Sequence, residues 1–307
     1  MRLLSNVLPL LCLLAAASSS AALPPAPADT AALPPASADA AAPLESVVTM
    51  RLDGSITVDE RGQVSEFHLD TPVVPVISTA LGRIVPQWQF KPVLVDGKPH
   101  SARAKVRMIL AAQKVGETYQ ARIDNAVFRD SFDASANANE SPALITAKRM
   151  PPPAYPFGAL QAGISGRVLL AVKVRADGRA DKVMPVQTLL FDVKGRELVL
   201  RAAIKQFEQA AVNATRSWRF NVAPRNTPRT DADMTVMVPV QYIVGSAQLD
   251  APGTWHTVIR GPKRKAQWLG EAPGLQRIGA SDASGTELIP ATSVVQLATE
   301  VAGAPVM

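Results

Sequence analysis

The sequence predicts a protein of the α+β class: two tandem small modules of the order strand, strand, helix, strand, after a signal peptide and a Pro/Ala-rich linker. Three observations lead to this prediction. Short runs of residues alternate between apolar and polar side chains, which is typical of half-buried strands. Two other stretches repeat their apolar residues every three or four positions, which is typical of an amphipathic helix. The turn and aromatic positions of the two modules also match, which indicates a duplication.

Residues 1–22 are predicted to be a secretory signal peptide. Arg2 precedes an apolar stretch over residues 7–17, and small residues follow it. Pro9 interrupts this stretch, which is shorter than the ~20 residues that span a bilayer. An uncleaved anchor in the inner membrane is the alternative. Cys12, the single cysteine, lies in this segment, so a cleaved chain would form no disulfide and no thiolate site.

Residues 23–44 are predicted to be an extended linker. They are nearly all Ala, Pro, Ser and Asp, and the five residues that begin at Ala22 recur from Ala32. Proline favours the polyproline II conformation and little in this segment can be buried, so the linker would act as a spacer.

The first predicted module covers residues 45–124. Two alternating runs, one with Ile56 and Val58 and one from Val64 to Leu69, flank a turn at residues 59–62. Gly62 would supply the positive φ of a tight hairpin, so the module begins with two paired strands.

The helix of this module is predicted to begin at Thr71 and Pro72, an N-cap residue followed by a first-turn proline. Pro86 would end it. Its apolar stripe has spacings of four and three and consists of Ile77, Leu81 and Ile84.

Three further segments complete the first module and its connection. Trp88-Gln89-Phe90 begins the next predicted element, and Asp96-Gly97 makes a turn after it. Alternation from Ala104 to Leu110 predicts the last strand of the module. Residues 125–141 are rich in Asp, Asn, Ala and Ser and are predicted to be a linker between the modules.

The second predicted module covers residues 142–244. Alternating runs from Val168 to Val174 and from Val183 to Leu190 flank a turn at Asp177-Gly178 and predict another hairpin. Alternation from Met234 to Tyr242 predicts the last strand. Between them lies an amphipathic helix, whose stripe consists of Val199, Ala203, Phe207, Ala210, Ala214 and Trp218.

Residues 245–307 are expected to be a weakly ordered tail. This segment is rich in Gly, Ala and Ser, and its apolar residues are scattered. It contains Lys263-Arg264-Lys265, three charges that we expect to be solvated.

The two modules match at corresponding positions. Gly178 follows Gly62 by 116 residues, and Trp218 follows Trp88 by 130 residues. The second copy is therefore 14 residues longer between these points, which is the difference between the two offsets. Each tryptophan is followed two residues later by Phe, and we expect both tryptophans to be core residues between helix and sheet. A tandem duplication explains the matches.

Composition excludes several classes of function. The 307 residues include 47% hydrophobic and 19% charged residues, as in a globular chain of one or two domains. A net charge of +6 and an aromatic content of 5% do not indicate a nucleic-acid partner. The three histidines, His68, His100 and His256, lie far apart in the sequence, so no metal site is expected. We predict no catalytic residues, no cofactor and no enzymatic activity.

The second module contains a set of short motifs that are specific in combination. They are Pro153-x-Tyr155-Pro156, Ala159, Gly163, Gly166-x-Val168, Asp177-Gly178, Trp218-x-Phe220 and Val238-Pro239-Val240-x-Tyr242. Together they resemble the C-terminal domain of TonB-type energy transducers, over roughly residues 142–244. The first module resembles the same domain more weakly, through Gly62, Trp88-x-Phe90-x-Pro92 and Asp96-Gly97-x-Pro99.

The resemblance implies a small sheet with a helix on one face, located in the periplasm, that binds a short extended segment of outer-membrane receptors. An edge strand exposes unpaired N–H and C=O groups, to which a peptide can add as a further strand. By resemblance, this edge is the last strand of the second module. Tyr155 is either a partner contact or part of a rigid segment before the first strand. The candidate partner-binding residues are Met234, Val236, Val238, Val240, Tyr242 and Tyr155.

Positive charge is concentrated in the second module. Residues 142–244 contain 15 Lys and Arg against 7 Asp and Glu, whereas residues 45–124 contain 10 against 9. This distribution agrees with a binding role for the second module.

The leading hypothesis is a periplasmic TonB-like protein that binds outer-membrane receptor segments or other envelope proteins by β-strand addition, in support of TonB-dependent transmembrane transport. Family transducers keep an uncleaved N-terminal helix that engages a proton-driven inner-membrane complex, typically with a histidine, and residues 1–22 contain none. That complex is a partner only if the leader is retained, with the protein anchored in the inner membrane. The alternative is a cell-envelope structural or adaptor protein that keeps the fold and transduces no energy. A secreted hydrolase is a third hypothesis, which would need an activity that depends on residues such as Asp177, Asp181 or His100.

Overall fold

The structure is a computed structural model, and most of the chain after residue 41 is described in it. The described residues are 42–95, 97–115, 117–130, 144–224, 228–245, 249–270, 278–283, 288–290, 295–299 and 302–306. The chain divides into two units, residues 1–30 and 31–307, and all described residues belong to the second unit. The predicted signal peptide and most of the predicted linker at residues 23–44 therefore lie outside the described residues.

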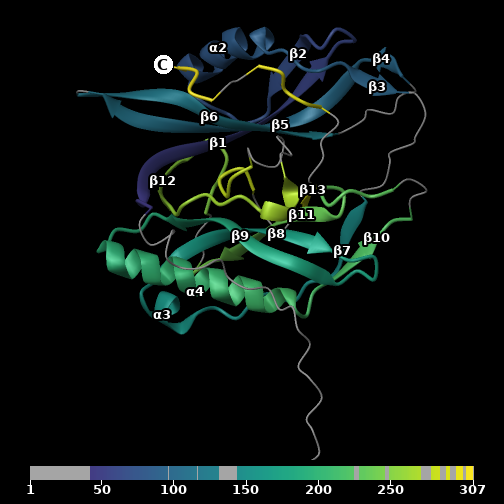
Figure 1. The fold of residues 1–307 in the computed structure, drawn as a ribbon. Helices are drawn as coiled ribbons and strands as arrows, with labels where there is room; N and C mark the ends of the chain where they lie inside the picture. The colour runs from purple at the N-terminus through teal and green to yellow at the C-terminus, as the bar shows by residue number, and fades with distance from the viewer. Residues whose placement is uncertain are drawn as a thin grey trace, which may run out of the picture. The chain divides into compact units, whose positions relative to one another are not determined.

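Residues 45–130 form the first half of the described chain. Most strands of this half lie on one side of a short helix (Figure 1). In chain order its elements are β1 (Glu45–Val58), β2 (Val64–Leu69), α2 (Pro75–Ile84), the 3-10 helix η1 (Val85–Gln87), β3 (Val93–Val95), β4 (Lys98–His100), β5 (Ala102–Val115) and β6 (Thr118–Asp130).

The second half, residues 145–242, is followed by the tail, which comprises the described residues from 249 to 306. The elements of the second half are β7 (Ile145–Arg149), α3 (Phe157–Gln161), β8 (Ser165–Val174), β9 (Ala180–Phe191), α4 (Glu197–Thr215), β10 (Arg219–Val222) and β11 (Thr235–Tyr242). The tail contributes β12 (Trp255–Arg260), the 3-10 helix η2 (Gln267–Leu269) and β13 (Ile289–Pro290). This strand-rich content with few helices is consistent with the α+β class.

Nine of the strands form one antiparallel sheet. Its order is β13-β11-β8-β9-β12-β1-β5-β6, and β2 pairs with β1 beyond the end of β12. Within each half the pairing is alike, because β1 lies between β2 and β5 as β8 lies between β9 and β11. The tail strand β12 pairs with β1 at residues 45–50 and with β9 at residues 189–191, so it joins the two halves.

In each half, the turn glycine of the hairpin contacts a phenylalanine later in the chain, and the two contacts are alike. Gly62 and Gly178 have φ angles of +82° and +79°. The carbonyl of Gly62 accepts a bond from the amide of Phe90, and that of Gly178 accepts one from Phe220, each at 2.8 Å. A Cβ would lie 2.0 Å from the carbonyl oxygen of Phe90 at Gly62 and 2.2 Å from that of Phe220 at Gly178. Both turns therefore require glycine for its positive φ and for the close approach of the backbone.

Buried apolar side chains form three clusters. The first lies between α2 and the sheet of the first half, where Leu81 and Met108 are fully buried. The second lies between α4 and the sheet of the second half and includes Phe207 and Tyr242. The third combines residues of both halves and of the tail, namely Val47, Ala111, Leu169, Ala171, Met237, Ile278, Ala280 and Ile289 among others. Figure 1 shows α2 and α4 on opposite outer sides, with tail segments between the halves.

The start of the first helix differs from the prediction. The helix begins at Pro75 with Val74 as its N-cap residue, three residues after Pro72. The hydroxyl of Thr71 instead accepts a bond from the Asp53 amide at 2.8 Å and lies 3.3 Å from the Asp53 carbonyl oxygen. Thr71 therefore fixes the chain to β1, and Pro75 supplies the first-turn proline.

The boundary between the halves also differs. The predicted last strand of the first module, from Ala104 to Leu110, is the middle of the longer strand β5. Residues 125–130, expected in the linker, belong to β6, which pairs with β5. The remainder of that predicted linker lies outside the described residues. The Asp- and Asn-rich composition hid a buried apolar run at residues 126–128, of which Ala126 and Phe128 join the cluster of the first half and Val127 joins the cluster between the halves.

The described part of the tail is not weakly ordered, and this corrects the expectation for residues 245–307. It supplies β12 and β13 to the sheet and contributes fully buried residues such as Ala280 and Ala283. Small side chains fit between two closely spaced layers, so the Ala- and Gly-rich composition reflects tight packing here.

Candidate partner-binding edge

The candidate binding strand β11 has buried side chains on both faces. Its inner side pairs with β8 over the full length Thr235–Tyr242. The candidate side chains are 9% exposed or less, in the order Met234 9%, Val236 2%, Val238 1%, Val240 5% and Tyr242 2%. Four of them belong to the cluster beneath α4, and Met237 on the opposite face is 2% exposed. A partner strand could therefore reach only the main chain of β11 along most of its length.

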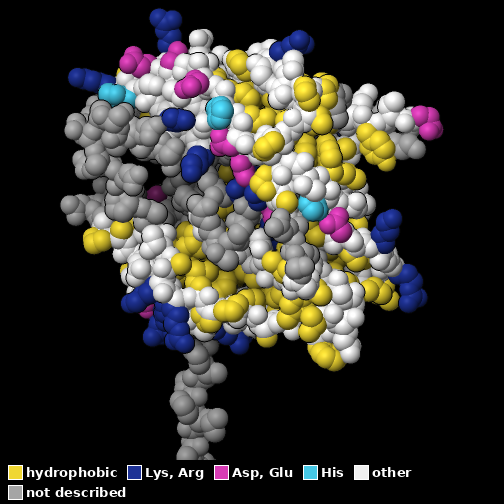
Figure 2. Space-filling view, turned by 180° about the vertical axis from the view of Figure 1, so that it is seen from behind, with side chains coloured by type: hydrophobic (Ala, Val, Ile, Leu, Met, Phe, Trp, Pro, Cys, Tyr) yellow, Lys and Arg dark blue, Asp and Glu magenta, His cyan; other side chains and the backbone are white. Residues whose placement is uncertain are grey.

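The surface of the second half carries some exposed apolar groups. Ile243 directly follows β11 and is 42% exposed. The other large apolar side chains exposed in the second half are Phe157, Leu160, Leu198 and Val199. Figure 2 shows apolar side chains across the lower part of one face, at the height where Figure 1 draws β8, β9 and α4, with Lys and Arg side chains at the margins.

Tyr155 lies in an aromatic group with Phe207 and Tyr242. Its ring packs edge-on against both, with centroid distances of 5.8 and 5.5 Å, and its hydroxyl donates to the Ile164 carbonyl at 2.6 Å. Tyr242 stacks on Phe207 at 4.4 Å and donates to the Phe207 carbonyl at 3.1 Å. Burial raises the pKa of both tyrosines. Tyr155 and Tyr242 thus come together, as parts of a packed and hydrogen-bonded core.

The outer side of β11 is partly occupied by the tail, so β11 is not the outermost strand of the sheet. β13 pairs there, with Pro290 opposite Val236 and Ile289 opposite Met237. Among the described strands, β13 is the one that pairs with the outer side of β11, and it pairs at Val236 and Met237. The predicted edge is therefore closed by the chain itself at one end of β11.

Two prolines indicate which backbone groups face outward. A proline is compatible with a strand where its missing N–H would point away from the neighbouring strand. Pro239 lies opposite Leu169 of β8 without a break in the pairing. We infer that residue 239 faces the outer side, and, because the strand has a period of two, residue 237 does as well. The next outward position after Met237 thus offers a carbonyl acceptor and no N–H donor.

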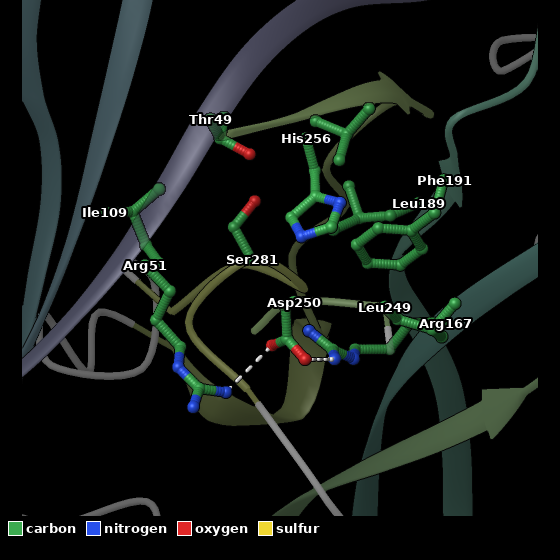
Figure 3. Close-up of a pocket in the computed structure, with 11 residues that line it drawn as sticks. Thr49, Arg51, Ile109, Arg167, Leu189, Phe191, Leu249, Asp250, His256 and Ser281 are labelled. Atoms are coloured by element: carbon green, nitrogen blue, oxygen red, sulfur yellow. Dashed lines mark hydrogen bonds and ion pairs between the residues drawn. The ribbon is translucent and has the colours of Figure 1, made fainter. Parts of the chain in front are cut away.

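A cluster of buried charges lies between the two halves (Figure 3). Asp250 of the tail pairs with Arg167 of β8 at 2.9 Å and with Arg51 of β1 at 3.2 Å. Asp53 pairs with Arg51 at 3.1 Å and with Arg107 of β5 at 2.7 Å. Arg167 is fully buried, and its desolvation lowers its pKa while Asp250 opposes this shift. Asp250 therefore links both halves through the tail.

The cavity beside this cluster is small. Its volume of about 20 Å³ is enough for roughly one water molecule. Thr49, His256 and Ser281 also line it, and the Nδ1 atom of His256 lies 3.0 Å from Asp192. The arrangement fits a structural charge network better than a ligand site.

A second, larger cavity of about 270 Å³ lies where the tail meets β6. Asp282, which is 2% exposed, accepts bonds from the Asn125 side chain at 2.7 Å and from the Gly279 amide at 2.6 Å. Desolvation raises the pKa of Asp282 to about 6, against these hydrogen bonds, which lower it. Burial also lowers the pKa of Lys263, which lines the same cavity.

The described residues contain no group of three or more His, Cys, Asp or Glu that could hold a metal ion. His68 lies 3.5 Å from Asp70 at the surface, and His100 is exposed on β4. Asp177 accepts a bond from the amide of Arg179 at 3.0 Å, which is the role of a turn aspartate.

The basic run in the tail is not simply solvated, which corrects that expectation. Arg264 pairs with Glu208 of α4 at 2.9 Å, and Glu208 is 6% exposed. Thr188 donates a further bond to Glu208 at 2.8 Å. The tail is thus held to the second half by a buried ion pair.

Sequence reasoning missed the residues that join the halves, above all Arg167 and Asp250. One signal was available, because residues 254–260 form a β-branched and aromatic run between Gly253 and Gly261. No pattern in the sequence pairs a lone Asp with arginines more than eighty residues away.

Comparisons with known proteins point to one kind of relative. The chain is 34% identical over 98 residues to "Protein TonB" of two Xanthomonas campestris pv. campestris strains, B100 and ATCC 33913. The match covers 32% of this chain and 37% of each relative, so the chain spans little more than a third of the length of these proteins. No family model and no solved structure matches the chain. The identity supports a TonB C-terminal-like domain within this chain.

The helices are short or polar. None of those in the described residues is long and apolar enough to cross a membrane.

Proposed function

We propose that this protein is a periplasmic TonB-like binding protein. It binds extended segments of outer-membrane receptors, or other envelope proteins, by strand addition at the outer side of β11, in support of TonB-dependent transport. The observation that carries the proposal is the 34% identity to TonB proteins over 98 residues. The position of β11 supports the site, because β13 is the one described strand that pairs with its outer side, and it pairs there at Val236 and Met237 alone.

Charge and surface chemistry also support the second half as the binding half. Residues 142–244 contain 15 Lys and Arg against 7 Asp and Glu, which favours a partner segment of acidic or neutral character. The exposed Ile243 continues the line of β11 and offers an apolar contact at its end.

We also propose that the two halves are copies of one module. Support comes from the shared pairing pattern and from the matched hydrogen bonds of Gly62 to Phe90 and of Gly178 to Phe220. The two hairpins differ in sequence, yet in each the carbonyl of the turn glycine accepts a hydrogen bond from the phenylalanine that follows the tryptophan of its own half. A common ancestor explains this match.

The second candidate function is an envelope adaptor that transduces no energy. The observation that favours it is β13, which occupies part of the edge that a receptor segment would use. In this case binding at β11 would serve assembly with other envelope proteins, and loss of the protein would leave receptor-dependent uptake intact.

The proposal can be tested at Ile243, whose substitution does not open the core. The probes are synthetic peptides that copy periplasm-facing extended segments of outer-membrane receptors, and binding is measured by fluorescence polarisation. Ile243→Asp is expected to weaken binding by about tenfold, because it replaces an apolar contact at the end of the edge by a charge. Leu94→Asp, on an exposed residue of β3, is the matched control and should bind like wild type.

Two results would contradict the proposal. Either the wild-type protein binds none of the peptides, or Ile243→Asp and wild type bind them equally well. A deletion strain then separates the two candidate functions, since only the transport role predicts a loss of receptor-dependent uptake.

A further inference from the structure

β13 is a short strand that the chain adds to its own candidate binding edge. Only Ile289 and Pro290 pair with β11, whereas β8 pairs with eight residues of β11 on its other side. The contact thus has the geometry of a bound peptide strand, supplied by the same chain.

The side chains of this segment enter both layers of the protein. Ile289 is 4% exposed and belongs to the cluster between the halves, together with Met237. Leu288, its neighbour, is partly buried against the cluster beneath α4. Consecutive residues of a strand point to opposite faces, so this site takes two neighbouring apolar residues, one on each face.

The strand contact is short for a reason that the sequence of β11 supplies. Pro239 is the next outward-facing residue after Met237 and has no N–H to donate. An added strand therefore gains regular main-chain bonds at Met237, and the ladder is interrupted at Pro239. With few main-chain bonds, β13 is held mainly by the burial of Ile289 and the partial burial of Leu288. A partner segment with two similar apolar residues can replace such a contact.

The tail is fixed on both sides of β13. Ala283 is fully buried before it and Val295 is 4% exposed after it. These anchors keep the strand close to β11 when it leaves the edge, so it competes with any partner at a high effective concentration.

We propose that β13 is an internal competitor for the binding edge of β11. A partner strand displaces it by placing two neighbouring apolar residues where Leu288 and Ile289 lie, and the released tail lowers the apparent affinity for every such partner. The inference rests on the proposed function and adds to it the class of partner segment and its regulation by the tail.

A reversible cross-link tests this proposal. Met237 and Ile289 lie directly opposite one another, and paired strand residues have Cα separations that a disulfide can bridge. The double variant Met237→Cys/Ile289→Cys would lock β13 to the edge when oxidised and free it when reduced. The single variant Ile289→Cys is the matched control, and Ile289→Asp supplies a chain with β13 permanently weakened.

Two fluorescent probes are used with each protein: a peptide that copies residues 284–294 of this chain, and the receptor-derived peptides described above. If β13 occupies the edge nine-tenths of the time, releasing it raises the apparent affinity of the edge for a probe peptide about tenfold. We therefore expect both probes to bind Ile289→Asp about tenfold more tightly than wild type. Binding to the oxidised double variant should be lost and should return on reduction, while Ile289→Cys should respond to neither treatment. Circular dichroism of each variant confirms that the fold is kept.

The outcomes separate this inference from the proposed function. If receptor peptides bind the oxidised and reduced double variant equally, the tail does not compete and the inference is wrong, although binding elsewhere on the protein stands. If only the peptide of residues 284–294 binds Ile289→Asp, the competition is real and receptors are not the partners. If neither probe binds any variant, the edge of β11 takes no added strand and both proposals fail at this site.

Discussion

The two halves of the molecule differ most at the outer side of the strand that follows the helix. In the first half, β5 is covered by β6, which pairs with it from Ala104 to Val115. In the second half, β11 is covered at two residues by β13. The corresponding strand is thus covered along most of its length in the first half and at two residues in the second half. The outermost strand of the first half is β6, which tail residues 303–306 bond at Ala121 and Ile123. Our proposal places the partner strand at β11.

The helices of the two halves differ in a related way. α2 has ten residues and buries Ile77 and Leu81, whereas α4 has 19 residues and buries eight. The half with the less protected edge thus has the longer helix beneath its sheet. Burial by α4 stabilises β8 and β11 from one face, so their position depends less on a neighbour at the outer edge.

The largest expected effect comes from separating the halves at Asp250. Asp250→Ala leaves the fully buried guanidinium of Arg167 without its carboxylate, and it removes one of the two carboxylates that pair with Arg51 of β1. Loss of one partner of a buried ion pair is expected to lower the free energy of unfolding by about 3–5 kcal/mol. Urea denaturation followed by circular dichroism measures this change.

Asp231→Ala is the matched control for this prediction. Asp231 pairs with Lys173 at 2.7 Å, and its side chain is half exposed. A surface pair contributes about 1 kcal/mol or less, so this variant should lie close to wild type. Equal losses for the two variants would show that the halves are not held together through Asp250.

The next prediction tests whether both hairpins depend on the close contact of their turn glycine with a phenylalanine. Gly62→Ala and Gly178→Ala each place a Cβ about 2 Å from a carbonyl oxygen, at a positive φ. Each should cost about 2 kcal/mol or more of stability, because the turn must either strain or release the aromatic segment. Gly82→Ala is the control, since a Cβ there meets nothing within 4 Å. A large loss of stability in one variant and none in the other would show that the two hairpins do not depend on the same glycine contact.

Local patterns predicted much of each half and little of what joins them. Alternation located β1, β2, β8, β9 and β11, and the turn glycines Gly62 and Gly178 marked the ends of β1 and β8. The sequence did not reveal that Asp250 meets Arg167, since contacts between distant segments leave no periodic signal. At the site, the pattern located the strand from Thr235 to Tyr242, but the resemblance made it an edge strand, and nothing in the sequence showed that Ile289 would pair with it.

The smallest effect concerns the place where the tail meets the first half. Desolvation raises the pKa of Asp282 from 3.8 to about 6, because the carboxyl is buried beside Asn125 of β6 and the amide of Gly279. A carboxyl with a higher pKa in the folded state takes up a proton on folding between about pH 4 and pH 6, so stability rises as pH falls through this window. The gain between pH 7 and pH 5 should be about 1 kcal/mol.

Asp282→Asn should remove this pH dependence, because an amide accepts the same bonds without a charge. Urea midpoints of both proteins at pH 7 and pH 5 test this, and an unchanged difference between the two pH values would exclude Asp282 as its origin. Asp282 contacts the first half, whereas β13 contacts the second. Binding of the 284–294 peptide to Ile289→Asp should therefore be the same at both pH values. If peptide binding and stability both change between pH 7 and pH 5, the contact of Asp282 with the first half and the contact of β13 with the second half are lost together.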